Sequence, residues 1–165
     1  MVADVENVEN DLFEKALSDS LRDFVHITQL KVEQKHCLRS LVEKKDVFGI
    51  LPTGFGKSII FQILPRVMKV LWNLERTTVL VVRPLVSIMK DQVEEMRQLG
   101  LKPYAIGLGD EETEKELRAS ADVEIIYGSP ESWCSPVWSR ELQDGQLGKQ
   151  IICIVVDEVH AVTAW

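Results

Sequence analysis

Continuous apolar runs mark the predicted strands of this chain. The runs at 78–83 and 151–156 consist largely of Val, Ile and Leu, without polar alternation. Runs of this kind are typical of central parallel strands that are covered on both faces. Shorter apolar runs predict three further strands at 47–50, 104–108 and 123–127.

Between these runs, apolar residues recur at the three- and four-residue steps of a helix. The spacing predicts helices over 11–25, 31–44, 57–64, 88–99 and 110–120. We expect the small and acidic residues 1–10 to be frayed. Pro65 should end or kink its helix near Leu64, because proline lacks the N–H that the helix needs. Strands that alternate with helices predict one α/β domain.

Capping residues add local start and stop signals. Ser87 is a suitable N-cap for the helix that follows it, and Gly100 is a suitable stop. Ser129 followed by Pro130 is a second helix start. Trp133, Val137 and Trp138 follow at helical spacing, so we predict that they pack in the core rather than stack on bases.

Composition bounds the class of protein. The 165 residues are 45% hydrophobic and 27% charged, which suits one soluble globular domain. The net charge of −7 gives no overall basic field, so any nucleic-acid binding must be local. Cys37, Cys134 and Cys153 form no C-x-x-C pair, which favours a reduced intracellular setting. No apolar run approaches the ~20 residues of a membrane helix.

The stretch from Leu51 to Ser58 lies between an apolar run and an apolar helix. Gly54 and Gly56 allow the backbone to turn several N–H groups toward one anion, and the helix adds its positive dipole end. Lys57 can reach the outer phosphates of a nucleotide, and the Ser58 hydroxyl can bind Mg²⁺. Leu51 stands where the usual P-loop has its first glycine, so an accidental Gly-Lys-Ser turn is the alternative.

A pair of carboxylates, Asp157 and Glu158, follows the strand at 151–156. The carboxyl ends of parallel strands form the edge at which α/β sheets bind ligands. Asp157 could hold Mg²⁺ through water, and Glu158 could orient or deprotonate the water that attacks the γ-phosphate.

Gln34 is the polar member of the apolar stripe on the helix at 31–44. An unpaired buried amide costs ~1–3 kcal/mol, so Gln34 should have a polar partner. The simplest partner is nearby backbone.

Several of these motifs together resemble the RecQ family of ATP-dependent DNA helicases. Pro-Thr-Gly-x-Gly-Lys-Ser resembles the P-loop of superfamily 2 helicases, and the segment ending at Gln34 resembles the family's Phe-Arg-x-x-Gln. The other matches are Pro-Leu-Val-Ser-Ile-Met-Lys-Asp-Gln at 84–92, Tyr-Gly-Ser-Pro-Glu at 127–131, Asp-Glu-Val-His at 157–160 and Trp165. The resemblance implies an α/β RecA-like P-loop NTPase fold, mainly a parallel sheet with helices on both faces. It places an N-terminal acidic segment and helix at 1–25 and the first RecA-like domain at 26–165.

The resemblance also implies a role for each motif. Gln34 would recognise adenine, and ATP with Mg²⁺ would bind to Thr53, Gly54, Phe55, Gly56, Lys57, Ser58 and Asp157. Asp157, Glu158 and His160 would be catalytic, with His160 coupling the nucleotide to DNA. Pro84, Ser87, Ser129 and Trp165 would contact nucleic acid. Arg83 stands where the family commonly has a small residue, and either a phosphate contact or simple solvation is open.

The implied function is that of a motor domain in a 3′-to-5′ DNA helicase acting on single strands and duplex junctions. In that family ATP binds between two RecA-like domains. The chain ends shortly after the Asp-Glu-Val-His motif at 157–160, which we call the acidic box. We therefore expect the fragment alone to be inactive without its second domain. We expect an intracellular, soluble protein, nuclear if eukaryotic. A DEAD/DEAH-box RNA helicase domain and a non-catalytic nucleotide-binding or interaction module are the alternatives.

Overall fold

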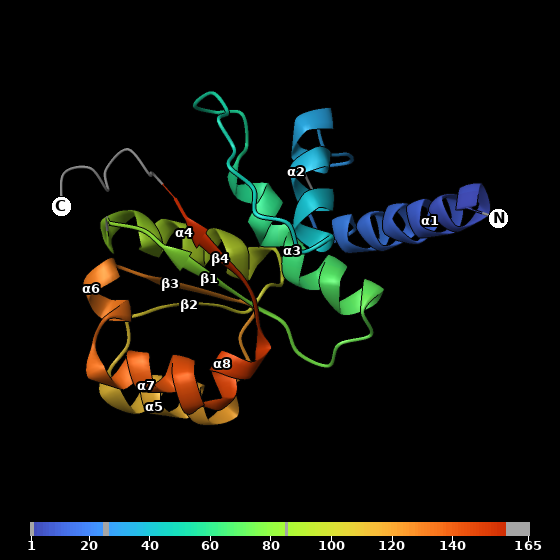
Figure 1. The fold of residues 1–165 in the computed structure, drawn as a ribbon. Coiled ribbons are helices and arrows are strands. Elements are labelled where there is room, and N and C mark those ends of the chain that lie inside the picture. The colour runs from blue at the N-terminus through green and yellow to red at the C-terminus, as the bar shows by residue number, and fades with distance from the viewer. Residues whose placement is uncertain (1, 25–26, 85, 158–165) are drawn as a thin grey trace. The chain divides into compact units, whose positions relative to one another are not determined.

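The computed structural model describes residues 2–24, 27–84 and 86–157 (Figure 1). They form two compact units, Met1–Glu75 and Arg76–Trp165. The first unit is helical, and the second contains a four-stranded sheet.

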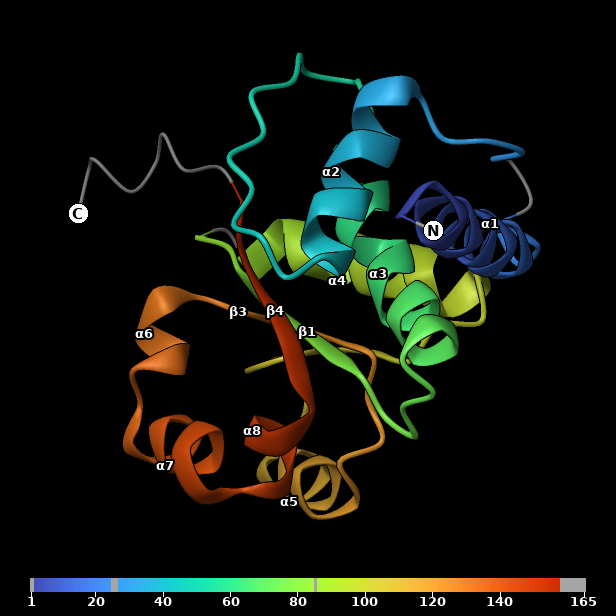
Figure 2. The ribbon, with the colours of Figure 1, turned by 45° about the vertical axis from the view of Figure 1, so that its right-hand side comes forward.

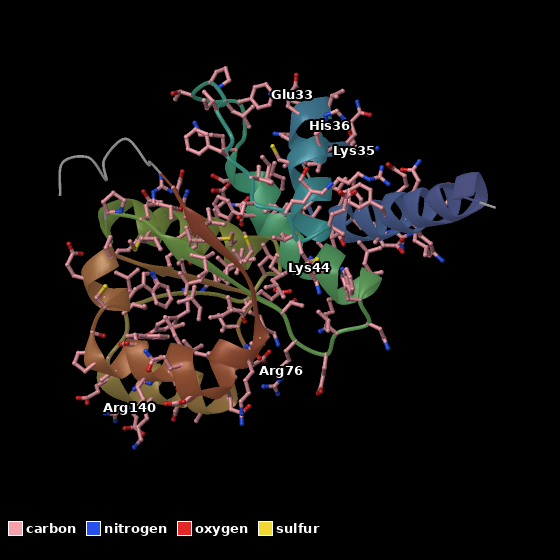
Figure 3. All side chains as sticks on the ribbon, in the orientation of Figure 1. Glu33, Lys35, His36, Lys44, Arg76 and Arg140 are labelled. Carbon is pink, nitrogen blue, oxygen red and sulfur yellow. The ribbon has the colours of Figure 1, made fainter. Side chains whose placement is uncertain are left out.

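Three helices build the first unit: α1 (Val2–Leu21), α2 (Val32–Val42) and α3 (Ser58–Leu71). α3 packs against both other helices, and its Ile63 and Val67 are fully buried. Burying side chains of this size stabilises a fold by ~1.5–3 kcal/mol each. Lys35 of α2, labelled in Figure 3, also forms an ion pair with Glu14 of α1 at 2.6 Å.

The start of α1 corrects one prediction. The helix begins at Val2 and ends at Leu21, so the expectation that residues 1–10 would be frayed is wrong. The predicted apolar stripe is confirmed farther along, where Phe13, Ala16 and Leu17 are buried.

Pro65 was expected to end or kink its helix near Leu64, and the expected end is wrong because α3 continues to Leu71. Proline removes one backbone donor from the helix and restricts the residue before it. Tertiary packing offsets that local cost, because the apolar side chains on both sides of Pro65 are buried. The helix is therefore kept by its packing and not by its local propensity.

Residues 45–50 have no regular secondary structure, so the strand predicted at 47–50 is not formed. Figure 2 shows the segment between α2 and α3 as a long loop. Phe48 and Ile50 are 78% and 84% exposed. A strand needs a neighbour that completes its backbone hydrogen bonds, and the strands of the described chain all belong to the second unit.

The second unit contains the strands β1 (Thr78–Val82), β2 (Pro103–Ala105), β3 (Ile125–Gly128) and β4 (Ile151–Val156). They are all parallel, in the order β2-β3-β1-β4. Val82 lies beside Gly128 on one side and Val156 on the other. The carboxyl ends of the three neighbouring strands β3, β1 and β4 therefore meet at one edge. β2 is shorter than predicted, and the chain turns at Gly107 with φ +82°.

Helices cover both faces of this sheet (Figures 1 and 2). α4 (Val86–Gln98) lies on one face, where the Tyr127 hydroxyl donates to Met96 Sδ at 3.6 Å. On the other face lie α5 (Glu111–Ser120), α6 (Pro130–Trp133), α7 (Pro136–Asp144) and α8 (Gln146–Gln150). The predicted α/β fold, a parallel sheet between two layers of helices, is confirmed.

The two tryptophans pack as predicted. The prediction is wrong for Val137, which is 51% exposed, because consecutive residues on a helix do not share a face. Trp133 and Trp138 are buried, and their rings meet edge to face with centroids 5.3 Å apart. They join a core with Leu80 and Ile126 of the sheet. Gly128 makes this packing possible, because a Cβ there would lie 2.7 Å from the Trp133 ring.

The capping predictions had mixed outcomes. Ser129 is the N-cap of α6 and accepts from the Ser132 N–H at 3.2 Å, as predicted. Gly100 follows α4 with φ +70°, also as predicted. α4 begins at Val86, however, so Ser87 lies in its first turn and the predicted N-cap is wrong. Helix starts are uncertain by a residue or two from sequence alone, because the next residue can take over the first turn.

Candidate functional site

The loop before α3 has the backbone that an anion cradle requires. Gly54 and Gly56 adopt φ of +77° and +85°, a region that residues with a Cβ rarely enter. At Gly56 there is also no room for a side chain, because a Cβ would lie 2.9 Å from Gln34 Nε2. Both glycines are therefore needed by the conformation of this loop.

Gln34 of α2 holds the loop in place. Its Nε2 donates to the carbonyl oxygens of Phe55 and Gly56, at 3.0 Å each, and its Oε1 accepts from the Lys31 N–H at 2.8 Å. The side chain is 5% exposed. The predicted polar partner of Gln34 is thus backbone, 21 and 22 residues ahead in the chain as well as on its own helix.

Lys31 adds a second contact to the same loop. Its ammonium donates to the Phe55 carbonyl oxygen at 3.1 Å and lies 4.1 Å from the centre of the Phe55 ring. A cation over an aromatic face is attracted by about 0.5–1 kcal/mol at an exposed site. Lys31 and Gln34 together fix Phe55 from both its backbone and its side chain. The sequence offered no signal for this Lys31 contact, because the two residues are far apart in the chain.

Lys57 and Ser58 lie where the loop meets the helix. Ser58 is the first residue of α3, and Lys57 is its N-cap. The Lys57 ammonium donates to the Leu51 carbonyl oxygen at 3.2 Å, so it reaches back to the start of the loop. Thr53 is exposed. A cation, a hydroxyl and the positive end of a helix dipole beside two left-handed glycines suit the phosphates of a nucleotide.

The acidic box begins at the end of β4. Asp157 follows this strand, and its backbone N–H donates to the Val82 carbonyl oxygen at 3.1 Å. The predicted position at the carboxyl edge of the sheet is confirmed for Asp157. Glu158, His160 and Trp165 lie outside the described residues.

Arg83 is the unexpected partner of Asp157. It follows β1, the neighbour of β4, and its Nη1 lies 3.2 Å from Asp157 Oδ2. Arg83 is 8% exposed and is therefore not simply solvated. Among the described residues, neither its Nε nor its Nη1 has a hydrogen-bond partner. An unsatisfied buried donor costs ~1–3 kcal/mol, so this guanidinium is held at some expense in stability.

The Asp157 carboxylate fits the way Mg²⁺ binds in nucleotide sites. The part of the chain that the structure describes has no group of three or more His, Cys, Asp or Glu side chains that could hold a metal. Mg²⁺ usually takes one or two protein ligands and completes its shell with water and substrate phosphates. Asp157 and Ser58 are ligands of the right kind.

Two of the residues predicted to contact nucleic acid lie at the same sheet edge. The Arg83 N–H donates to the Gly128 carbonyl oxygen at 3.0 Å. Pro84 and Ser129 are the next residues after this pair, so each follows a strand end at this edge. The Ser129 hydroxyl oxygen already accepts one hydrogen bond, from the Ser132 N–H, as the N-cap of α6.

The parallel sheet between two helical layers in the second unit has the architecture of a RecA-like α/β domain, and the first unit carries the P-loop. The sequence matches the DEAD/DEAH box helicase family over residues 31–165. The chain therefore belongs to the DEAD/DEAH box helicase family.

Its relatives point to one branch of that family. The chain is 32% identical to the ATP-dependent helicase SGS1 of Saccharomyces cerevisiae over 154 residues, which is 88% of this chain and 10% of SGS1. It is 32% identical to the probable ATP-dependent DNA helicase RecS of Bacillus subtilis, covering 90% of this chain and 28% of RecS. The identity to the ATP-dependent DNA helicase RecQ of Synechocystis is also 32%, covering 92% of this chain and 30% of that protein.

The predicted resemblance to RecQ-family helicases is confirmed by these matches. The chain spans between 10% and 30% of the length of these relatives. Among the described helices, none combines the length and apolar character needed to cross a bilayer.

Proposed function

We propose that this chain is the ATP- and DNA-binding motor domain of a RecQ-like 3′-to-5′ DNA helicase. In the whole protein, ATP hydrolysis would be coupled to DNA unwinding. The observation that carries the proposal is the P-loop with two left-handed glycines, fixed by Gln34 from α2. The RecQ-type names of the relatives favour DNA over RNA as the nucleic acid.

The P-loop residues would bind the triphosphate. Thr53, Gly54, Phe55 and Gly56 would form the cradle, and Lys57 would exchange its bond to the Leu51 carbonyl for the outer phosphates. Such an exchange is favourable because a phosphate offers the ammonium a full charge in place of a carbonyl dipole.

Gln34 would recognise the adenine base without leaving the loop. The carbonyl oxygen of a glutamine has two lone pairs, and the Lys31 N–H uses one. The second can accept from the exocyclic amine of adenine. Guanine places an acceptor oxygen at the corresponding position, which the same lone pair repels. The loop contacts of Nε2 would be retained in both cases.

The acidic box would act on the γ-phosphate. Bound Mg²⁺ would neutralise charge on the outer phosphates, held by Ser58 and Asp157. Glu158 would accept the proton of the attacking water, and His160 would couple the nucleotide to DNA. Pro84, Ser87, Ser129 and Trp165 would contact the strand, with the positive end of a helix dipole near Ser129 suited to a phosphate.

The first test is calorimetric titration of this chain with ATP and with GTP in the presence of Mg²⁺. We expect ATP to bind, and we expect Lys57→Ala to weaken it at least about tenfold, because the substitution removes a charge-assisted contact to phosphate. Lys69→Ala is the matched control, since Lys69 is an exposed lysine in the last turn of the same helix.

Two outcomes would count against the proposal. A folded sample that binds no nucleotide at millimolar concentration would favour a non-catalytic interaction module. Equal losses in Lys57→Ala and Lys69→Ala would show that the P-loop lysine has no special contact. Labelled single-stranded DNA, titrated with and without ATP and followed by fluorescence anisotropy, tests the second ligand.

A further inference from the structure

Arg83 is the one charged side chain found buried in the described part of the chain. It lies against Asp157, and the two side chains are only 10% and 14% exposed. The contact joins the carboxyl ends of two neighbouring strands, β1 and β4. Of the two roles considered for Arg83, a phosphate contact or simple solvation, its burial excludes the second.

The ion pair is incomplete in a way that makes it displaceable. An arginine that locks a carboxylate normally uses two parallel N–H···O bonds. Here Nη1 lies at 3.2 Å from one carboxylate oxygen without hydrogen-bond geometry, and Nε has no partner among the described residues. Arg83 thus acts on Asp157 mainly through its positive charge, and its Nε and Nη1 do not hold the carboxylate by hydrogen bonds.

We propose that Arg83 occupies the cation position of the acidic box, so that its guanidinium and a divalent cation compete for the Asp157 carboxylate. This inference rests on the proposed function, in which Asp157 is the carboxylate nearest to Mg²⁺. Without metal, the guanidinium contributes a positive charge beside a carboxylate whose side chain is only 14% exposed. A divalent cation at the same oxygen would place two cations within a few ångströms, and their repulsion must be relieved by movement of Arg83.

Competition of this kind lowers the affinity for the metal, and the repulsion between the two cations sets the size of the decrease. Coupling between two ligands of one protein is typically about 5–150-fold in affinity. We therefore expect removal of the Arg83 charge to tighten divalent-cation binding by about tenfold. The same change removes one cation from beside Asp157, so a divalent cation there should stabilise the variant more than the unchanged chain.

The experiment compares the unchanged chain with Arg83→Met, which keeps most of the side-chain length and removes the charge. Mn²⁺ is the probe, measured by electron paramagnetic resonance with and without saturating ATP. Thermal unfolding in EDTA and in Mn²⁺ is the second readout. Arg140→Met is the control, because Arg140 is an exposed arginine of α7 in the same unit (Figure 3).

The proposal predicts about tenfold tighter Mn²⁺ binding for Arg83→Met, with little change for Arg140→Met and for Arg83→Lys, which retains the charge. It also predicts that Mn²⁺ raises the melting temperature of Arg83→Met more than that of the unchanged chain. In the double variant Arg83→Met with Asp157→Asn, both effects should disappear.

Three results would overturn the inference: Mn²⁺ binding of Arg83→Met within about twofold of the unchanged chain, an equal change in Arg140→Met, or an effect that survives Asp157→Asn. Arg83→Gln keeps the test decisive if Arg83→Met does not fold, because it also removes the charge and competition predicts that it too binds Mn²⁺ about tenfold more tightly. If the chain binds no nucleotide, the proposed function fails. Mn²⁺ binding and unfolding without ATP still decide the competition separately.

Discussion

Replacing Gln34 with alanine removes the side chain that joins α2 to the P-loop. The substitution deletes the hydrogen bonds to the Phe55 and Gly56 carbonyl oxygens and to the Lys31 N–H. Gln34 is 5% exposed, so water replaces these partners only in part. We expect two separable effects, one on the stability of the loop and one on nucleotide choice.

The magnitude follows from the three bonds. A hydrogen bond between neutral groups contributes about 1 kcal/mol net, which sets an upper value of ~3 kcal/mol for Gln34. The Phe55 carbonyl keeps its bond to the Lys31 ammonium, and Lys31 itself is exposed. These two features reduce the expected loss to about 2 kcal/mol, or about thirtyfold in the equilibrium for local opening.

Hydrogen exchange measures this loss where it occurs. Amides of the loop and of the start of α2 should exchange about thirtyfold faster in Gln34→Ala, and amides of the sheet should be unaffected. Gln98→Ala, at an exposed position of α4, is the matched control. In calorimetry, loss of the loop contacts should weaken the binding of ATP and of GTP equally. Loss of the Gln34 contact to adenine should appear as a loss of the preference for ATP over GTP.

The two contributions can fail independently. Unchanged exchange in the loop would refute the structural role of Gln34. An ATP-to-GTP affinity ratio that survives the substitution would refute adenine recognition and leave the loop contact intact.

Gly128→Ala should destabilise the second unit by about 1–3 kcal/mol, because the new Cβ would lie 2.7 Å from the buried Trp133 ring; urea unfolding followed by tryptophan fluorescence measures it. A loss below ~0.5 kcal/mol would mean that the ring moves freely. The second prediction concerns Asp110, whose pKa is lowered from 3.8 chiefly by the hydrogen bond from the Thr113 N–H. A lowered folded-state pKa stabilises the fold above pH 3.8, and that contribution is lost as the pH falls through the lower folded value. The melting temperature of the unchanged chain should therefore fall relative to that of Asp110→Asn below about pH 4, and parallel curves would contradict the assignment.

The sequence predicted most of the second unit because its signals are local. The β-branched runs gave β1 and β4, and the residue pair Ser129-Pro130 gave the start of α6. Burial of Trp133 and Trp138 followed from their helical spacing. In each of these cases, the tertiary structure agrees with the preference of a short segment, which is the condition under which pattern reasoning works.

The candidate site was predicted less completely, because its contacts depend on register. Gln34 was expected to have a polar partner, but the identity of that partner depends on how α2 lies beside the loop. The pairing of Arg83 with Asp157 follows from the alignment of Val82 with Val156, and no local pattern carries that alignment. The available signal was that Arg83 and Asp157, which carry opposite charges, each directly follow a predicted central strand. That signal could have suggested an ion pair between them.

Two of the errors in the first unit have a common cause. The run at 47–50 has the composition of a strand, but strand structure depends on a partner, and side-chain pattern alone does not supply one. Pro65 is the opposite case. It is a strong local signal for the end of a helix, but α3 continues past it because α3 packs against α1 and α2. Local propensity is worth about 3 kcal/mol even for proline. A few buried side chains exceed it, so the formation of each element was decided by the presence or absence of something to pack against.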